Sequence, residues 1–236
     1  MENKLTRPIK VVIGASNPDY SYSPHQGVTA GHLLSATAGS VVNGGVEGVG
    51  LDVFIGAAAH AAINKTDLDF HALIPESYAV PLNQENYSTI HETEESGAYM
   101  SLPFDIPDSY LEVCKLYNKK LQIVRAGEEM SDRRLALAKI ADVVIMINGS
   151  SGTLDEAIHS INMRKRLIIC ANTGGAANYL AQWIMGKKAN FGEDRFDHYN
   201  KVWKDMLRAR AIPNGPIANV TICKSVWDLP NIIAKI

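Results

Sequence analysis

A glutamate and a loop rich in glycine and serine lie close together in the second half of the chain. The loop is Asn148-Gly-Ser-Ser-Gly152, and Glu156 follows Thr153 by three residues. Such a loop between a strand and a helix directs free backbone N–H groups and the positive helix end toward an anion, most often a phosphate. A carboxylate one turn inside that helix can accept hydroxyl groups or orient water. The predicted phosphate-binding residues here are Gly149, Ser150, Ser151, Gly152 and Thr153.

The segments around this loop predict the strand and the helix that position it. Residues Val143 to Ile147 form a short, mostly β-branched apolar run, which is typical of a strand buried on both faces. A helical pattern starts at Thr153. Thr153 and Glu156 also have the spacing of a capping box, in which Thr153 caps the helix and Glu156 bonds back to it. That interpretation needs no ligand, and the sequence leaves both open.

Other small-residue turns follow further predicted strands, at residues 14–18, 44–50 and 172–176. In an open parallel sheet, ligands gather at the carboxyl ends of the strands. Turn chemistry and close packing of helix on strand also explain these residues individually, but several glycine loops at one edge of a sheet together favour a nucleotide-like ligand. The residues predicted to bind it are Gly14, Ser16, Gly44, Gly45, Gly48, Thr173, Gly174 and Gly175.

Short β-branched runs alternate with helical patterns, which predicts an α/β fold: a three-layer, Rossmann-like parallel sheet with helices on both faces. A chain of 236 residues can form one such domain, over 1–236. Strands are predicted at 10–14, 40–43, 69–75, 143–147, 167–171 and 220–223. One helix is predicted from the end of the glycine loop at 44–50 through residue 62. Further helices are predicted at 27–37, 110–119, 132–141, 177–185, 200–210 and 227–236. The range of about 77–129 is predicted as an irregular insertion that acts as a lid or an oligomer contact.

Composition excludes several classes of protein. The net charge of −2, from 23 basic and 25 acidic residues, gives no reason to expect a nucleic-acid partner. No apolar run has the length of a membrane span and the first residues do not resemble a signal peptide, so we expect a cytoplasmic protein without a membrane partner. Three cysteines without a C-x-x-C pair and scattered histidines predict no disulfide and no metal site. We also expect no bound cofactor. The cysteines are Cys114, Cys170 and Cys223.

Two motifs resemble those of the Lonely Guy (LOG) proteins, a family also called lysine decarboxylase-like. Their signature P-G-G-x-G-T-x-x-E is similar to residues 148–156, and a preceding M-x-x-R-K is similar to residues 130–134. The separation of 23 residues between Arg133 and Glu156 matches the family spacing. Residues 43–49 resemble a glycine block of the family, and Leu73-Ile-Pro75 resembles a strand end. The similarity spans about 9–171, with Asn148 in place of proline, Ser150 in place of glycine and Arg134 in place of lysine.

This resemblance implies a nucleoside-monophosphate phosphoribohydrolase that forms a homodimer or higher homo-oligomer. It makes Arg133 and Glu156 the catalytic pair and the two glycine loops the phosphate and nucleotide site. Cleavage of the N-glycosidic bond passes through an oxocarbenium-like sugar, which Glu156 would stabilise while Arg133 binds the phosphate or the departing base. Taken alone, Arg133 would be interpreted as a solvated residue at a helix start, and its spacing from Glu156 is what favours the catalytic role.

Two other functions use the same loops. A binding or carrier module would hold a nucleotide or a molybdenum cofactor without cleaving it, and residues 173–177 resemble such branches of the superfamily. A dinucleotide-dependent oxidoreductase is disfavoured, since no acidic residue lies about twenty positions after a proper glycine fingerprint.

Overall fold

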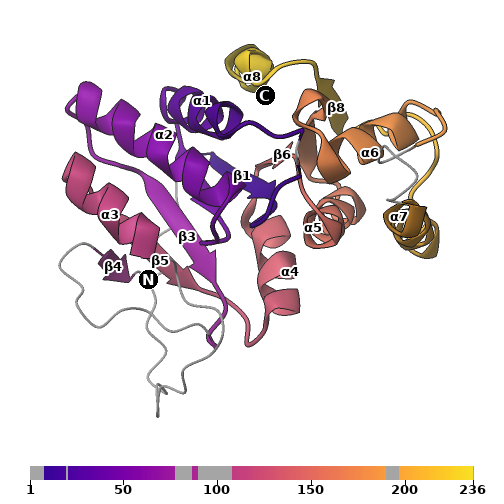
Figure 1. Cartoon of the computed structure of the whole chain (residues 1–236), viewed down its shortest axis with the longest axis horizontal. Helices are drawn as coiled ribbons and strands as arrows, with labels where there is room; N and C mark the ends of the chain where they lie inside the picture. Colours follow the sequence, from indigo (N-terminus) through magenta and orange to yellow (C-terminus); the bar gives the residue numbers. More distant parts are fainter. Residues whose placement is uncertain (1–7, 20, 78–86, 90–107, 190–196, 236) are drawn as a thin grey trace.

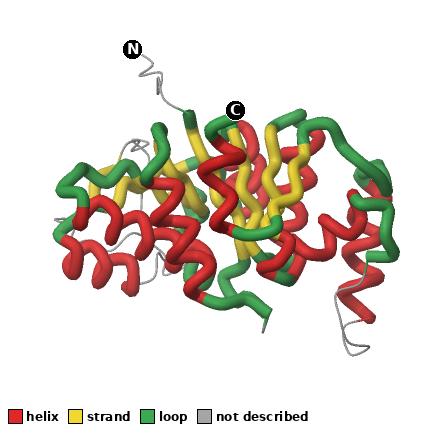
Figure 2. The backbone as a smooth tube through the Cα atoms, turned by 90° about the horizontal axis from the view of Figure 1, so that it is seen from above, coloured by secondary structure: helices red, strands yellow, loops and turns green. Residues whose placement is uncertain are grey.

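An eight-stranded parallel sheet forms the centre of the protein. The computed structural model describes residues 8–19, 21–77, 87–89, 108–189 and 197–235. All strand pairs are parallel, and the strand order is β4-β5-β3-β2-β1-β6-β7-β8. The strands are β1 (Ile9–Gly14), β2 (Ser40–Asn43), β3 (Phe70–Ile74), β4 (Tyr87–Thr89), β5 (Leu121–Arg125), β6 (Val143–Ile147), β7 (Arg166–Cys170) and β8 (Val220–Cys223). The strands lie side by side through the middle of the molecule (Figure 2).

Helices cover both faces of this sheet. On one face α1, α2, α3 and α8 pack on side chains such as Val12 and Ile145, and on the other face α4, α5, α6 and α7 pack on Val11 and Val144. Figure 1 shows α1, α2 and α3 grouped together, with α8 beside α1. The helices are α1 (Pro24–Ser35), α2 (Val49–Ile63), α3 (Asp108–Tyr117), α4 (Met130–Ile140), α5 (Ser151–Asn162), α6 (Gly175–Ile184), α7 (Asp197–Ala209) and α8 (Leu229–Ile233). The predicted Rossmann-like α/β fold is confirmed.

The strand order reverses between β1 and β6. From β1 the chain builds outward through β2 and β3 to β5, and then returns to pair β6 with the other side of β1. In open α/β sheets, the crevice outside the carboxyl ends of the strands at such a switch point receives the ligand. Gly14 ends β1 there, and the loop after β6 begins at Asn148.

The range 77–129 is less irregular than predicted. It contains α3 and also β5, which pairs with β3 from His71↔Gln122 to Ile74↔Arg125. The sequence signal for β5 is weak because only Leu121 and Ile123 are buried and polar Gln122 and Arg125 interrupt the apolar run. The polar and proline-containing stretches at 84–96 and 102–107 lie almost wholly outside the described residues. The lid or oligomer role stays a prediction.

The ends of several helices also differ from prediction, as three examples show. Helix α1 begins at Pro24, three residues before the predicted start, because proline suits the first helical position. Helix α5 begins at Ser151 rather than Thr153. The closing helix is short, with a 3₁₀ turn at Val226–Asp228 before α8. None of the helices in the described ranges is long and apolar enough to span a bilayer.

Candidate functional site

The loops after β1, β2 and β6 meet at the switch point. The Val49 N–H donates to the carbonyl of Ala15 at 3.1 Å, which joins the start of α2 to the loop after β1. Gly48 has a φ of +65°, and a Cβ there would lie 2.6 Å from the carbonyl oxygens of Ala15 and Ser16. At Gly14, a Cβ would lie 2.5 Å from Val49 Cγ1 and 2.9 Å from the Ile147 oxygen. These glycines therefore serve close approach of the loops, and the Ser16 side chain is exposed.

The N-terminus of α5 has unsatisfied donors. Within the described ranges, the N–H groups of Ser151, Gly152 and Thr153 have no hydrogen-bond acceptor, and Leu154 is the first to bond back, to the Ser150 carbonyl at 3.0 Å. Ser150, with φ −119° and ψ −161°, is the N-cap, but its side chain makes no cap hydrogen bond. Ser150 is exposed. The helix end is therefore open to an anion from solvent.

Arg133 and Glu156 form a buried ion pair beneath this helix end. Arg133 Nη2 donates to Glu156 Oε1 at 2.9 Å, and each residue is only 5% exposed. The capping-box interpretation is wrong, because Thr153 lies inside the first turn and Glu156 bonds to Arg133 instead. The solvated interpretation of Arg133 is also wrong.

Burial is the main influence on the Glu156 carboxyl group. It raises the pKa of Glu156 above its usual value, while Arg133 and then Arg134 oppose the shift. Arg133 engages Oε1 alone, and Glu156 Oε2 has no hydrogen-bond partner among the described residues. One carboxylate oxygen thus remains for a ligand or a water molecule.

The first glycine loop makes room for the arginine. Arg133 Nη1 donates to the Gly44 carbonyl at 2.9 Å, and a Cβ on Gly44 would lie 1.7 Å from that nitrogen. Asn43 holds the same loop from inside, since its Oδ1 accepts from the Gly45 N–H at 2.9 Å. The Tyr110 hydroxyl donates to the Val46 carbonyl at 2.8 Å. The predicted residue Gly44 therefore contacts the ion pair, and Gly45 is held beside it in the same loop by Asn43.

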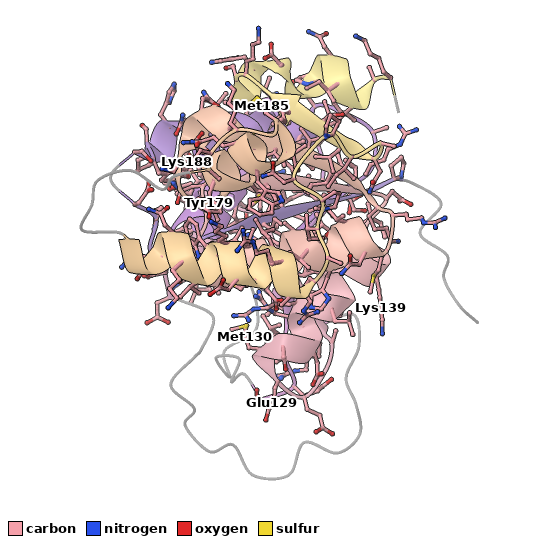
Figure 3. The ribbon with its side chains drawn as sticks, turned by 90° about the vertical axis from the view of Figure 1, so that its right-hand side faces the viewer. Glu129, Met130, Lys139, Tyr179, Met185 and Lys188 are labelled. Carbon is pink, nitrogen blue, oxygen red and sulfur yellow. The ribbon has the colours of Figure 1, made fainter. Side chains whose placement is uncertain are left out.

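Arg134 adds a second positive charge to the α5 end. A Cβ on Gly152 would lie 2.9 Å from Arg134 Nη2, so the guanidinium lies directly beside the first turn. Asp155 is 3.7 Å from Arg134 and partly balances it. Helix α7 packs on the same region: Trp203 Nε1 donates to Ser151 Oγ at 2.8 Å, and Figure 3 shows α7 crossing this side next to Tyr179 of α6.

The loop after β7 is engaged in the protein's own contacts. Thr173 Oγ1 accepts from the Asn148 N–H at 2.6 Å and donates to the Cys170 carbonyl at 2.6 Å, and Thr173 is fully buried. The Gly174 N–H donates to the Ala171 carbonyl at 3.3 Å, and the Gly175 N–H donates to Asp19 at 3.0 Å. The polar groups through which these three residues were predicted to bind a ligand are thus already used.

Two residues in this region were not predicted to matter. Asn148 has a φ of +50°, and its Nδ2 donates to Asp19 Oδ1 at 2.8 Å and to the Thr173 carbonyl at 2.7 Å. Asp19 comes from the loop after β1. Asparagine tolerates left-handed φ better than most residues, which offers a sequence signal for Asn148. Asp19 has no such signal for this site, because the partners that bring it there, Asn148 and Gly175, lie far along the chain.

No group of three or more metal-ligating side chains occurs in the described ranges. The cysteines do not form a disulfide, and all three are buried. Cys170 and Cys223 are register partners on neighbouring strands. The site combines N–H donors, two arginines and the carboxylates of Glu156 and Asp155, and the donors and arginines are groups that can bind an anion.

Comparison with known proteins gives the fold but no family. No protein-family model and no curated protein sequence matches the chain. The X-ray structure of a protein designated TM1055 is 20% identical, with a TM-score of 0.56, over 97% of this chain and 99% of that one. DNA processing protein A from Helicobacter pylori, described as binding single-stranded DNA, is 15% identical with a TM-score of 0.53, over 97% and 80%. The molybdenum cofactor binding protein from Rippkaea orientalis is 14% identical with a TM-score of 0.51, over 98% of both chains.

At these identities the likeness concerns the fold alone. The chain has a Rossmann-like fold, similar over almost its whole length to that of a cofactor-binding protein.

Proposed function

We propose that the chain binds the 5′-phosphate of a nucleoside monophosphate at the N-terminus of α5 and hydrolyses its N-glycosidic bond. One observation carries the proposal. The unsatisfied N–H groups of residues 151–153 lie one helical turn from Glu156, a buried carboxylate paired with Arg133. A phosphate on these N–H groups would satisfy them and interact with the positive helix end.

The reaction breaks the bond between C1′ and the base nitrogen and forms a bond from C1′ to a water oxygen. The base nitrogen takes a proton, and the products are the free base and ribose 5-phosphate. The transition state carries positive charge on the sugar, as in glycoside hydrolysis. A negative carboxylate near C1′ stabilises that charge.

Glu156 has the oxygen and the environment for this role. Its Oε2 is available to a ribose hydroxyl or to the attacking water, and burial of the group strengthens its electrostatic interactions. Arg133 keeps the carboxylate oriented, since Nη2 donates to Oε1, and its positive charge opposes the rise in the Glu156 pKa that burial causes. Because Arg133 also bonds to the Gly44 carbonyl, its guanidinium is fixed in position. We assign Arg133 the task of positioning Glu156. The buried Nε of Arg133 has no partner among the described residues, and we assign this atom to recognition of the ligand.

The test is incubation of the protein with a panel of nucleoside monophosphates, with free base and ribose 5-phosphate measured by chromatography. Glu156→Gln should lower turnover by about 10²- to 10⁴-fold, the usual contribution of acid–base catalysis. The amide keeps the size of the side chain and an acceptor for Arg133. Glu156→Ala should also lose turnover, but it leaves Arg133 buried without a counter-charge, which costs about 3–5 kcal/mol of stability.

Glu112→Gln is the matched control. Glu112 is exposed on α3, so this substitution makes the same chemical change at a position away from the site. It should turn over nucleotides at the rate of the unmodified protein. Unchanged turnover in Glu156→Gln would reject the catalytic role of Glu156.

A carrier module is the second candidate, and the closed Arg133–Glu156 pair favours it. In a carrier, this pair would brace the loops after β2 and β6 rather than act on a substrate. The fold likeness to the molybdenum cofactor binding protein is consistent with this candidate. Tight binding of one nucleotide or cofactor without release of base from any member of the panel would decide for the carrier.

A further inference from the structure

Four donors converge on the carboxylate of Asp19. Oδ1 accepts from the Ser21 N–H at 3.1 Å, from the Ser21 hydroxyl and from Asn148 Nδ2 at 2.8 Å, and Oδ2 accepts from the Gly175 N–H at 3.0 Å. No lysine, arginine or histidine pairs with Asp19 within the described ranges. Its charge is therefore balanced by N–H and O–H groups and by the positive end of α6, which is how proteins hold a free anion.

Asp19 contacts the start of α6 and the Asn148 side chain, and Gly149 lies between the starts of α5 and α6. A Cβ on Gly149 would lie 2.6 Å from Thr153 Cβ, and a Cβ on Gly175 would lie 2.6 Å from the Gly149 oxygen. Gly149 therefore touches the first turn of α5 on one side and the start of α6 on the other. Two neighbouring anion positions result, of which the protein itself fills the one at α6.

Asn148 connects Asp19 with the loop that leads into α5. Its side chain is fully buried, yet Oδ1 has no hydrogen-bond partner among the described residues. Nδ2 of the same amide donates to Asp19. Oδ1 is a hydrogen-bond acceptor, so it suits a donor such as a ligand hydroxyl group, whereas the Nδ2 donor is the part of this amide that suits a phosphoryl oxygen.

We propose that Asp19 is a built-in anion in the position of a second phosphoryl group, so that the site accepts ligands with one phosphate and rejects diphosphates. The inference rests on the proposed phosphate site at α5. A diphosphate seated there would bring its second charge against the Asp19 carboxylate, and such like-charge contacts are a common means of rejecting a ligand. Removal of the carboxylate frees the Gly175 N–H and Asn148 Nδ2 as donors.

Calorimetric titration with inorganic phosphate and with inorganic pyrophosphate tests this directly. In Asp19→Ala, which removes both charge and volume, the affinity ratio of pyrophosphate to phosphate should rise about tenfold over that of the unmodified protein. Asp19→Asn removes the charge but keeps the volume, so it should raise the ratio by less. Asp67→Asn is the control for net charge, because Asp67 is exposed at a distance from these loops. It should leave the ratio unchanged.

A ratio within twofold of the unmodified protein in both Asp19 variants would overturn the inference, as would an equal loss of affinity for both probes. The equal loss would mean that Asp19 merely braces the loops. The thermal melting curve shows whether Asp19→Ala folds. If it does not, the pyrophosphate-to-phosphate affinity ratio of Asp19→Asn is compared alone with that of the unmodified protein, and a ratio within twofold overturns the inference. Failure of the proposed function looks different: the unmodified protein would then bind no phosphate at all.

Discussion

Helices α5 and α6 follow neighbouring strands, and each begins after a loop rich in glycine, yet their N-termini differ. The first N–H groups of α5, from Ser151 to Thr153, have no acceptor within the described ranges. At α6 the N–H of Gly175 donates to Asp19, that of Ala176 to the Gly149 carbonyl at 2.9 Å, and that of Ala177 to the Asn148 carbonyl at 2.9 Å. The N-terminus of α5 is thus open to a ligand, whereas the N-terminus of α6 holds the loop that leads into α5.

The difference assigns two tasks to similar sequences. The donors of α6 fix Asn148 and Gly149, and Asn148 is thereby kept at its left-handed φ of +50°. A rigid loop lets the N–H groups of α5 point in a constant direction without ordering cost on binding. A helix end that binds a ligand is thus supported by a second helix end that does not.

The strongest test of this difference is to close the open end. In Ser150→Asp, the new N-cap carboxylate should accept from the free N–H groups of α5 and take the place of the ligand's phosphate. We expect phosphate affinity to fall about 100-fold, which corresponds to about 2.7 kcal/mol. Calorimetric titration with inorganic phosphate measures it.

The same variant should gain stability, because a carboxylate at a helix N-terminus contributes about 0.3–1 kcal/mol. Ser150→Ala is the control, since it supplies no anion and should bind phosphate nearly as the unmodified protein does. Unreduced affinity in Ser150→Asp would show that the N-terminus of α5 is not the phosphate site.

A second test opens the closed end. Thr173→Val removes the hydroxyl that accepts from the Asn148 N–H and donates to the Cys170 carbonyl, and so leaves two buried groups unpaired. We expect the free energy of unfolding to fall by about 1–3 kcal/mol. Urea denaturation checks it, with exposed Thr66→Val as the control, which should change stability by less than about 0.5 kcal/mol. Equal, small losses in the two variants would contradict the bracing role of Thr173.

The smallest expected effect concerns the ion pair beneath the open end. Burial raises the pKa of Glu156 in the folded protein above the usual 4.5. Between 4.5 and that raised value, the folded state holds a proton that the unfolded state has released, so the free energy of unfolding should decrease as the pH rises through this window. Glu156→Gln should lack this part of the slope.

Urea denaturation of both proteins at a series of pH values measures the difference. Asp52, whose pKa burial also raises, contributes equally to both proteins and cancels. A slope of the opposite sign would mean that the charge of Arg133, rather than burial, has the larger influence on the pKa of Glu156.

The regular elements of the sheet could be predicted where local patterns are strong. Strand β6 is an unbroken apolar run and was predicted with its observed bounds, as was the short strand β2. Strand β5 was missed because alternating polar residues at an outer position of the sheet give a weak pattern. Glycine loops after the strands were also predictable, since turns and close approaches require glycine locally.

The use of each loop could not be predicted. The segments 173–175 and 150–153 both consist of glycine and hydroxyl residues, and the residues that surround them in the folded protein give them different uses. The spacing of Thr153 and Glu156 fits a capping box, but Glu156 instead forms a buried ion pair. Its partner Arg133 lies 23 residues before Glu156 in the chain, beyond the reach of any local pattern.

The sequence by itself therefore determined the strands other than β4 and β5, most helices and the edge of the sheet at which loops gather, because hydrophobic periodicity and turn chemistry act between near neighbours in the chain. The tertiary structure decided which helix end stays open and which carboxylate is paired. Those outcomes depend on Asp19 meeting Asn148 across 129 positions and Gly175 across 156. Contacts at such separations are set by how the strands are ordered in the sheet, and no local pattern carries that order.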